Sequence, residues 1–455
     1  MSRAVEELVE FVTRTRFEDL PASVVAQTKL VLMDTLAAIF GGSQSPEVVN
    51  LARLATQSSS TRSSTIFGHA EPADPRWASL VNATAGTSTE LDEGHAYAKG
   101  HPAIHTLPAA LALGEELDST GRDILLSIAL GYEVAARVGQ ACNLRQSAHP
   151  HGTWGTLGAA TAAAKLMPMD ATGIRESIDI ASSLTLATSF QTAIDGALVR
   201  NIYAGMSNQN GLLAAQLATC GFTGERNGVV NVFGKVMSDR FDENALTDEL
   251  GERFEITRGY FKIHSCCRYN HATLDAMQLL REEEPFSAQE VKRIQVETYA
   301  LAAQLHGTRP ATTLAARFSI PYAIAIALVR NSTAPTAFDQ TALTDARIRA
   351  LAEKVHVREN PVFTAQTPAK RPACITIELN NGKTISKTVY SSRGDPDQPF
   401  TREEMIAKYR ALSAPIIGEQ DSERALALIE QLETSPSIKT LTQLCRPRRN
   451  RDIPR

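Results

Sequence analysis

Two histidines in matching sequence contexts are the first candidates for chemistry. Five of the ten histidines fall between residues 95 and 151, and two of these occur as Gly100-His101-Pro102 and Ala148-His149-Pro150. A residue before proline is disfavoured in the helical region, so both histidines are expected on extended loops. Each loop leads into an alanine-rich helix, whose N-terminal N–H groups suit a carboxylate or phosphate. The pair could transfer protons there, or could be loop histidines held by backbone hydrogen bonds.

Acidic residues and further histidines surround the first loop. Asp92 and Glu93 are adjacent, so on a helix they would point about 100° apart and could not act as a facing pair. Either could orient a histidine, accept a proton or be an ordinary surface charge. The spacing of His95, His101 and His105 also raises the alternative that they are zinc ligands. Pro102 disfavours a helical pair there, so we expect no metal site.

Two later segments combine cations with aromatic or amide groups. One contains Arg200 and Tyr203 at the start of a long predicted helix, in GALVRNIYAGMSNQNG. The other contains Lys262, Arg268 and His271 ahead of a further helix, in KIHSCCRYNH. Both segments could contact an anionic ligand.

A third segment, Arg317 to Tyr322, places Tyr322 at a predicted helix start in the second half of the chain. Cys266 and Cys267 suggest a nucleophile, but adjacent cysteines more often have a packing role. We therefore expect no thiol chemistry.

The elements that must position these residues are helical up to about residue 265. The segment from Pro21 to Phe40 begins at a proline suited to a first helical turn and ends at two glycines. Its apolar residues repeat with helical spacing and predict one buried stripe. Other predicted helices span about 76–90, 105–117, 121–140, 155–167, 172–184 and 204–220. Residues 1–265 are therefore predicted to form an all-helical domain.

The pattern changes after about residue 270. Alternating residues predict strands at Lys292–Tyr299, Ala373–Leu379 and Lys383–Tyr390, and the last two flank an Asn-Asn-Gly turn signal. Helices fit at about 271–282, 316–330 and 343–353. Residues 270–400 are therefore predicted to form a smaller α+β domain. Helices return at about 402–412 and 422–433, and residues 400–455 are predicted to complete the helical domain.

Composition and charge exclude several classes of protein. The 455 residues include 46 Lys and Arg and 50 Asp and Glu, a net charge of −4 that is too balanced for a nucleic-acid or membrane-surface binder. Six scattered cysteines without a CxxC pair indicate a cytoplasmic protein. We expect no signal peptide and no membrane span, because the apolar stretches are interrupted before about 18 residues. Walker, GxGxxG, HExxH and GxSxG motifs are absent.

Six segments, taken in order, resemble the MmgE/PrpD family, which includes 2-methylcitrate dehydratase, cis-aconitate decarboxylase and iminodisuccinate epimerase. The segments are AQTKLVLMDTLAAIFGG, LDEGHAYAKGHPAIHTLPAALALGEEL, HPHGTWGTLGAATAAAKLM, GALVRNIYAG, FKIHSCCRYNHATLDA and FSIPYAIAIAL. The resemblance covers about residues 5–435. It implies a helical domain with an α+β lid, an active site in the cleft between them, a homodimer, and no metal or organic cofactor.

The resemblance also implies site residues. At six positions this chain has the residue type that the family uses in its site: Asp92, His101, His149, Lys262, His271 and Tyr322. One segment departs from the decarboxylase-like and epimerase-like members, which have a Thr-Lys-Pro-Leu-His type of sequence there. In this chain a lysine is replaced by Arg200 and a histidine by Tyr203, and Ala148 replaces a common aromatic residue. The cations and hydrogen bonds of the pocket are therefore changed.

Together these residues predict a positively lined pocket for a di- or tricarboxylate. Arg200 can grip one carboxylate through two parallel hydrogen bonds, which a lysine cannot. Lys262 and His149 can hold others, with Tyr203, Arg268 and His271 as further binding residues.

The reactions of the family share removal or delivery of a proton on a carbon next to a carboxyl group, which requires a base of near-neutral pKa and preorganised cations. We expect His101 to be the base or acid, Asp92 to orient it, and Tyr322 to be a second proton donor from the second domain.

The predicted activity is that of a lyase without a cofactor. Dehydration is ranked first, epimerisation second and decarboxylation third, since the three differ only in the fate of the carbanion. Two other classes stay open. One is a catalytically inactive carboxylate-binding protein, and the other is a metal-dependent hydrolase that uses the histidine cluster.

Overall fold

Helices dominate the first half of the chain. A computed structural model describes residues 2–447. Its first helices are α1 (Arg3–Arg14), α2 (Ala22–Ser43), α3 (Pro46–Ser58), α4 (Pro75–Ser88), α5 (Pro102–Leu117), α6 (Gly121–Ala141), α7 (Gly155–Leu166), α8 (Ala171–Ser183), α9 (Gln191–Asp195) and α10 (Val199–Thr219). Two short antiparallel pairs lie between them, β1 (Gly94–His95) with β4 (Gly259–Tyr260) and β2 (Cys142–Leu144) with β3 (Ser238–Phe241).

The start of α5 shows how local sequence positions a candidate residue. Pro102 occupies the first turn, where a missing N–H leaves no hydrogen bond unmade. His101 precedes it as the N-cap residue, with φ −128° and ψ 77°, outside the helical region. The expected loop position of His101 is therefore confirmed, and α5 begins three residues earlier than the sequence pattern suggested.

The second half contains a mixed sheet and its covering helices. The strands are β5 (Val291–Thr298), β6 (Val355–Glu359), β7 (Ala373–Leu379) and β8 (Thr384–Val389), in the order β6-β5-β7-β8. Only β5 and β6 are parallel. The helices are α11 (His271–Glu283), α12 (Ala300–Ala303), α13 (Thr313–Arg317), α14 (Ile320–Arg330), α15 (Gln340–Thr344), α16 (Ala346–Ala352) and α17 (Pro361–Thr364).

Two predictions for this half need correction. The helix predicted over 316–330 is interrupted, because the Ser319 hydroxyl accepts from the Tyr322 N–H and starts α14 as a new helix after α13. Strand β6 was not predicted from the sequence. It pairs with β5 alone, with Val296 opposite Val357. The sequence of such an edge strand shows little alternation of apolar and polar residues, so it gives a weak signal.

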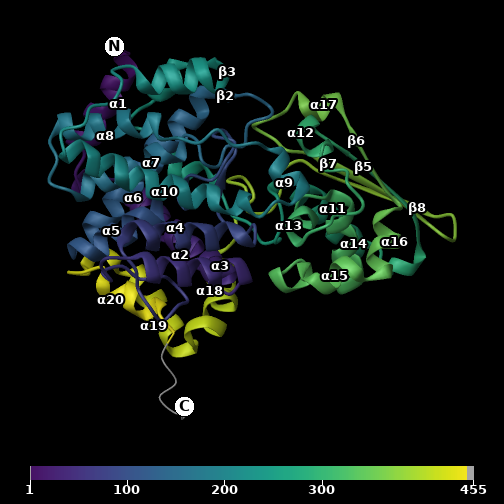
Figure 1. Ribbon diagram of the computed structural model, residues 1–455. Helices are drawn as coiled ribbons and strands as arrows, with labels where there is room; N and C mark the ends of the chain where they lie inside the picture. Colours follow the sequence, from purple (N-terminus) through teal and green to yellow (C-terminus); the bar gives the residue numbers. More distant parts are fainter. Residues whose placement is uncertain (1, 448–455) are drawn as a thin grey trace, which may run out of the picture.

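The C-terminal helices are α18 (Arg402–Ile417), α19 (Glu419–Glu430) and α20 (Lys439–Thr442). Both α18 and α19 pack against α2. Figure 1 shows this yellow segment beside the purple N-terminal helices, far along the chain from them. The described part of 400–455 thus lies against the helical domain, while residues 448–455 fall outside the described residues.

Most buried apolar residues fall into two clusters. One contains residues from Val5 to Phe261 together with residues from Met405 to Cys445. The other contains residues from Cys266 to Val389, with Ala193 of α9 added to it. The fold is therefore a mainly helical N-terminal domain joined to a second domain with a mixed four-stranded sheet, which Figure 1 shows side by side.

Two helices are long and apolar enough to cross a membrane by length and composition alone, α2 and α6. This corrects the expectation that no stretch reaches that length. Of the most apolar 18 residues of each helix, 67% are buried in α2 and 89% in α6. Helices that are apolar on most sides are also typical of the centre of a large protein core, so packing accounts for the hydropathy of both.

Close packing of α6 on α7 generates a testable prediction. A Cβ atom added at Gly131 would lie 2.6 Å from the Gly158 carbonyl oxygen and 2.6 Å from a methyl carbon of Thr106. We expect Gly131→Ala to destabilise the protein by about 1–3 kcal/mol through overpacking, offset by at most about 1 kcal/mol of helix propensity. Thermal unfolding should show a lower midpoint. The control is Gly307→Ala, where no atom lies within 4 Å, and equal midpoints for the two variants would contradict the prediction.

Candidate active site

Segments from both domains meet around one small pocket. It includes Glu90 and His101 from the loop between α4 and α5, His149 and His151 from the loop before α7, and Arg200 from the first turn of α10. Residues of the second domain complete it. The pocket has about 410 Å³ of space between atoms, of which about 40 Å³ admits the centre of a water molecule. In this arrangement the pocket is therefore narrow.

The short β1–β4 pairing brings the two halves of the site together. Gly94 pairs with Tyr260, and a Cβ at Gly94 would lie 2.4 Å from the Tyr260 ring, so only glycine permits this approach. Lys262 follows β4 and its Nζ lies 3.3 Å from Oδ1 of Asp92. A sequence separation of 170 residues is thus closed by two backbone pairs.

Four buried charged side chains form a connected ion network, which we call the charge network: Glu90, Asp92, Arg200 and Lys262. Lys262 Nζ lies 3.6 Å from Oε2 of Glu90 in addition to its contact with Asp92. Arg200 forms an ion pair with Oε1 of Glu90. All four side chains are at most 2% exposed. Because the network holds two carboxylates and two cations, it is formally neutral.

The electrostatics of the network keep both of its central groups charged. Burial alone would raise the pKa of Asp92, but the positive charges of His101 and Lys262 outweigh it and hold that pKa well below its usual range. Burial likewise opposes the charge of Lys262, and Asp92 and Glu90 outweigh it and raise the Lys262 pKa. The pair is therefore ionised throughout the neutral range.

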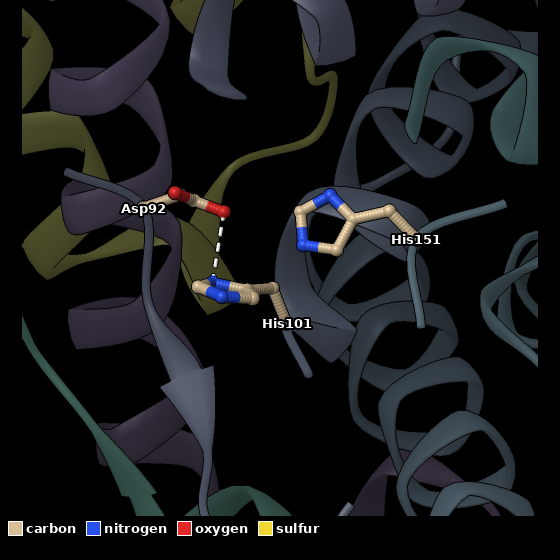
Figure 2. Close-up of side chains that lie close together, drawn as sticks. All are labelled: Asp92, His101 and His151. Atoms are coloured by element: carbon tan, nitrogen blue, oxygen red, sulfur yellow. Dashed lines mark ion pairs between the residues drawn. The ribbon is translucent and has the colours of Figure 1, made fainter. Parts of the chain in front are cut away.

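His101 is oriented by the same loop. Its Nδ1 lies 2.6 Å from the Glu93 carbonyl oxygen and 3.0 Å from Oδ2 of Asp92. Both partners can only accept, so Nδ1 carries the hydrogen. Nε2 is then the ring nitrogen available for proton exchange. Figure 2 shows the imidazole directed at the Asp92 carboxylate, with the His151 ring facing both from the other side.

The His101 ring belongs to a cluster of four histidine rings, which also includes His105, His149 and His151. The ring centroid of His151 is 4.8 Å from that of His101, 4.9 Å from that of His105 and 4.8 Å from that of His149. Burial lowers the pKa of His105 to about 3 and the pKa values of His149 and His151 well below the usual range. These three imidazoles are therefore neutral at pH 7, and the one beside a carboxylate is His101.

Sequence reasoning selected His149 but not His151 or His105. Both ring nitrogens of His151 and of His105 are buried without a hydrogen-bond partner among the described residues. His149 differs, because its Nδ1 accepts from the backbone N–H of His151 at 3.0 Å. The signal for His151 was its place two residues beyond His149, before Gly152 with φ +90°, a turn that returns the chain to the pocket.

Arg200 lines the pocket, whereas Tyr203 lies next to it with its ring centroid 5.9 Å from that of His149, and both have protein partners. Besides Glu90, Arg200 directs Nε to His149 Nε2 at 3.4 Å and lies over the Phe318 ring of the second domain, 5.2 Å from its centroid. The Tyr203 hydroxyl contacts the Thr192 hydroxyl at 3.2 Å. The expected two-pronged grip of Arg200 on a substrate therefore competes with its ion pair to Glu90.

Tyr322 is not brought to this pocket, which corrects the expectation that it acts there. Its hydroxyl donates to the Ala342 carbonyl oxygen at 2.6 Å, within the second domain. The reason is local, since the new helix start at Ser319 turns the first turn of α14 into the second core. Among the described residues, Tyr260 and Tyr269 are the tyrosines that line the pocket, and the ring of Tyr260 is 6.3 Å from that of His101.

Arg268 and His271 differ in position. Arg268 lines the pocket, lies 4.5 Å from the Tyr260 ring centroid and pairs with Asp395 at 2.7 Å. His271 is fully buried behind it, with Nδ1 3.1 Å from Arg268 Nη1 and Nε2 3.3 Å from the Cys266 carbonyl oxygen. In this arrangement His271 positions Arg268 and has no free nitrogen for a ligand.

One group among residues 2–447 could hold a metal ion, formed by Asp92, His101 and His151, whose donor atoms lie within 4.8 Å of one another. His95 is elsewhere, 3.2 Å from Glu255. The Lys262 ammonium beside Asp92 would repel a metal cation there, so the donor set fits a proton site better. Thiol chemistry is also disfavoured, since burial raises the pKa of Cys267 to about 11.

Comparisons with known proteins find matches along most of the chain. The MmgE/PrpD N-terminal domain matches residues 6–241, and the MmgE/PrpD C-terminal domain matches residues 264–434. The chain belongs to the MmgE/PrpD family. Cis-aconitate decarboxylase-like protein oryM of Aspergillus oryzae is 25% identical, over 96% of each chain. Cis-aconitate decarboxylase of Aspergillus terreus is 23% identical over 97% of this chain and 96% of its own. The Homo sapiens enzyme of that name is 25% identical over 92% and 90%.

Glu93, next to Asp92 in the sequence, makes the stability of the protein depend on pH. Glu93 accepts from the Tyr132 hydroxyl and from the Ala103 N–H, and burial raises its pKa from 4.5 to about 8. The folded chain therefore keeps a proton that the unfolded chain releases between these values, and this contribution to stability is lost as the pH rises through that window. Glu93→Gln removes the titration, so we expect the variant to gain stability relative to wild type from about pH 5 to about pH 8.

Urea unfolding of both proteins across this pH range measures the difference in free energy. The control Glu116→Gln removes an exposed carboxylate. A Glu93→Gln difference that stays constant with pH would show that Glu93 is ionised in the folded protein.

Proposed function

We propose that this protein is a lyase that acts on a small polycarboxylic acid, with His101 transferring the proton at a carbon next to a carboxylate. The observation that carries the proposal is the His101 arrangement. Nδ1 is held by the Glu93 carbonyl and Asp92, and Nε2 is left toward a pocket lined by cations. Such a group supports general acid–base catalysis, and the cations stabilise the enediolate that loss of CO₂ or removal of a proton creates.

Decarboxylation becomes the first candidate reaction, ahead of the dehydration that the sequence favoured. The support is that relatives covering more than 90% of the chain are named cis-aconitate decarboxylases or, in one case, a cis-aconitate decarboxylase-like protein. For an acid of that kind, the electron pair of the breaking C–CO₂ bond becomes a new C=C bond. The pair of the old C=C bond then takes a proton at its far carbon. We assign delivery of that proton to His101 Nε2, and solvent returns a proton to His101 after CO₂ leaves.

Dehydration remains the second candidate because of Arg200 and Tyr203. The expectation from the sequence is that decarboxylase-like members have a lysine and a histidine at these positions, and both are replaced here. In elimination of water, His101 would remove the proton and the hydroxide would leave with a second proton. Epimerisation would return the proton to the opposite face.

The narrow pocket lies between residues of both domains, so a shift of the second domain would make room for a polycarboxylic acid. We propose that substrate enters an open form and that closure excludes water from the charge network. The homodimer and the cytoplasmic location expected from the sequence remain proposals.

Incubation of the purified chain with di- and tricarboxylic acids in D₂O separates the candidate reactions. Decarboxylation should release CO₂ and leave one deuterium at the carbon that takes the proton, as seen by NMR. Dehydration should give an unsaturated acid with all its carboxylates, and epimerisation should give deuterium at an inverted centre. An acid that binds but shows neither turnover nor exchange would instead identify an inactive carboxylate-binding protein.

Replacement of His101 tests its assigned role. We expect His101→Gln to lower kcat by about 10²-fold or more on the best acid of the panel, because glutamine keeps a polar group but transfers no proton. The control is His306→Gln, which changes an exposed histidine whose Nδ1 contacts a backbone carbonyl. Both variants should unfold at the wild-type temperature within about 2 °C. A kcat for His101→Gln within about threefold of wild type would remove His101 from the mechanism.

A further inference from the structure

The charge network leaves a polycarboxylate short of partners. Its two cations, Arg200 and Lys262, are already matched by Glu90 and Asp92, and Arg268 is matched by Asp395. A di- or trianion that enters a closed site must be paired with further positive charge, because burial of an unpaired carboxylate is strongly unfavourable. A substrate carboxylate therefore requires a cation at the pocket that has no carboxylate partner among the described residues.

Arg371 is one such cation. It comes from the second domain just before β7, lines the same pocket as His101, and is 9% exposed. Its Nη2 donates to the Ala96 carbonyl oxygen at 3.0 Å, across the domain boundary. Its Nη1 is buried and has no hydrogen-bond partner in the described part of the chain, and Arg371 forms no ion pair there.

Aromatic rings fix the plane of this guanidinium. The Arg371 Cζ atom is 5.4 Å from the Tyr260 ring centroid and 6.0 Å from that of Tyr269. Rings on the faces of a guanidinium leave its N–H edges free for planar hydrogen bonds. Since one edge is used by Ala96, the Nη1 edge is left for an acceptor that no residue among 2–447 supplies within hydrogen-bond distance.

Lys99 is the second unmatched cation. It lies in the turn that Ala96 begins, lines the pocket, and also lines an adjoining hollow that shares Pro150, Phe190 and Tyr269 with it. Within residues 2–447, its Nζ has one hydrogen bond, to the Asn143 side-chain oxygen at 3.2 Å. Its backbone has φ +56°, a conformation that non-glycine residues seldom adopt and that often marks functional sites. Lys99 is an exposed residue, and partial desolvation together with the Arg371 charge lowers its pKa.

We propose that Arg371 and Lys99 form the subsite for a carboxylate of the substrate remote from the reacting carbon, and that this subsite selects acids with an additional carboxylate. The inference rests on the proposed function, since it names the substrate class of that site. It also assigns Arg371 a coupling role, because a carboxylate bound to this second-domain residue holds the two domains closed over His101.

Binding of unreactive acids tests the subsite without requiring turnover. The probes are propane-1,2,3-tricarboxylate and glutarate, which lacks only the central carboxylate, measured by calorimetry at about pH 7.5 where both are fully ionised. We expect wild type to bind the tricarboxylate at least about tenfold more tightly than glutarate. Arg371→Gln should weaken tricarboxylate binding by about 10–100-fold, the range for charged hydrogen bonds, and abolish the preference.

Three further variants make the result specific. Arg371→Lys should recover part of the affinity, since it restores charge without the planar edge. Lys99→Asn should reduce the preference by at least about threefold with an intact backbone, because asparagine tolerates positive φ. Arg358→Gln is the control, an exposed second-domain arginine paired with Glu297, and it should bind both acids as wild type does.

A wild-type protein without preference, or an Arg371→Gln variant that keeps it, would overturn the proposal. If Arg371→Gln does not fold, Lys99→Asn decides, and an unchanged preference in that variant overturns the subsite. The two proposals fail separately. If wild type prefers the tricarboxylate, Arg371→Gln loses that preference and no acid is turned over, the subsite stands and the lyase is rejected. Turnover together with a preference that does not depend on Arg371 would do the reverse.

Discussion

The buried charge network is the constraint on which the rest of the site depends. Glu90, Asp92, Arg200 and Lys262 come from three distant parts of the chain and are almost completely removed from water. Removal of one member would leave an uncompensated buried charge, which typically costs about 3–5 kcal/mol. The network therefore fixes the loop of residues 90–101 against α10 and the strand before Lys262, and with that loop it fixes His101.

Charge and burial in the site also determine which of the side chains can exchange a proton. Because the network is formally neutral, it can orient His101 without attracting a metal or a loose anion. The neighbouring imidazoles of His105, His149 and His151 are kept neutral by burial, so proton exchange is confined to the ring that has a carboxylate partner. Arg371 is 9% exposed and forms no ion pair among residues 2–447, so a carboxylate bound to it would interact at low dielectric.

Most helices could be predicted from the sequence because their apolar spacing, prolines and caps are local signals. Helices α2, α4, α6, α7 and α11 lie within a few residues of their predicted bounds. Where the prediction failed, the structure depended on an interaction that the local sequence pattern indicates weakly. The Ser319 cap divided one predicted helix, and β6 exists because β5 offers it a parallel partner. Apolar helices α2 and α6 owe their burial to neighbours that no local pattern specifies.

The sequence by itself determined the family resemblance, the two loop histidines and the cations that surround them, since residue type and the prolines after His101 and His149 are local facts. Only the tertiary structure decided which charges are already matched. It showed Arg200 paired with Glu90, directed Tyr322 into the second core and brought Arg371 to the pocket. The reason is that ion pairing and burial depend on contacts between residues far apart in the chain, which spacing along the sequence does not encode.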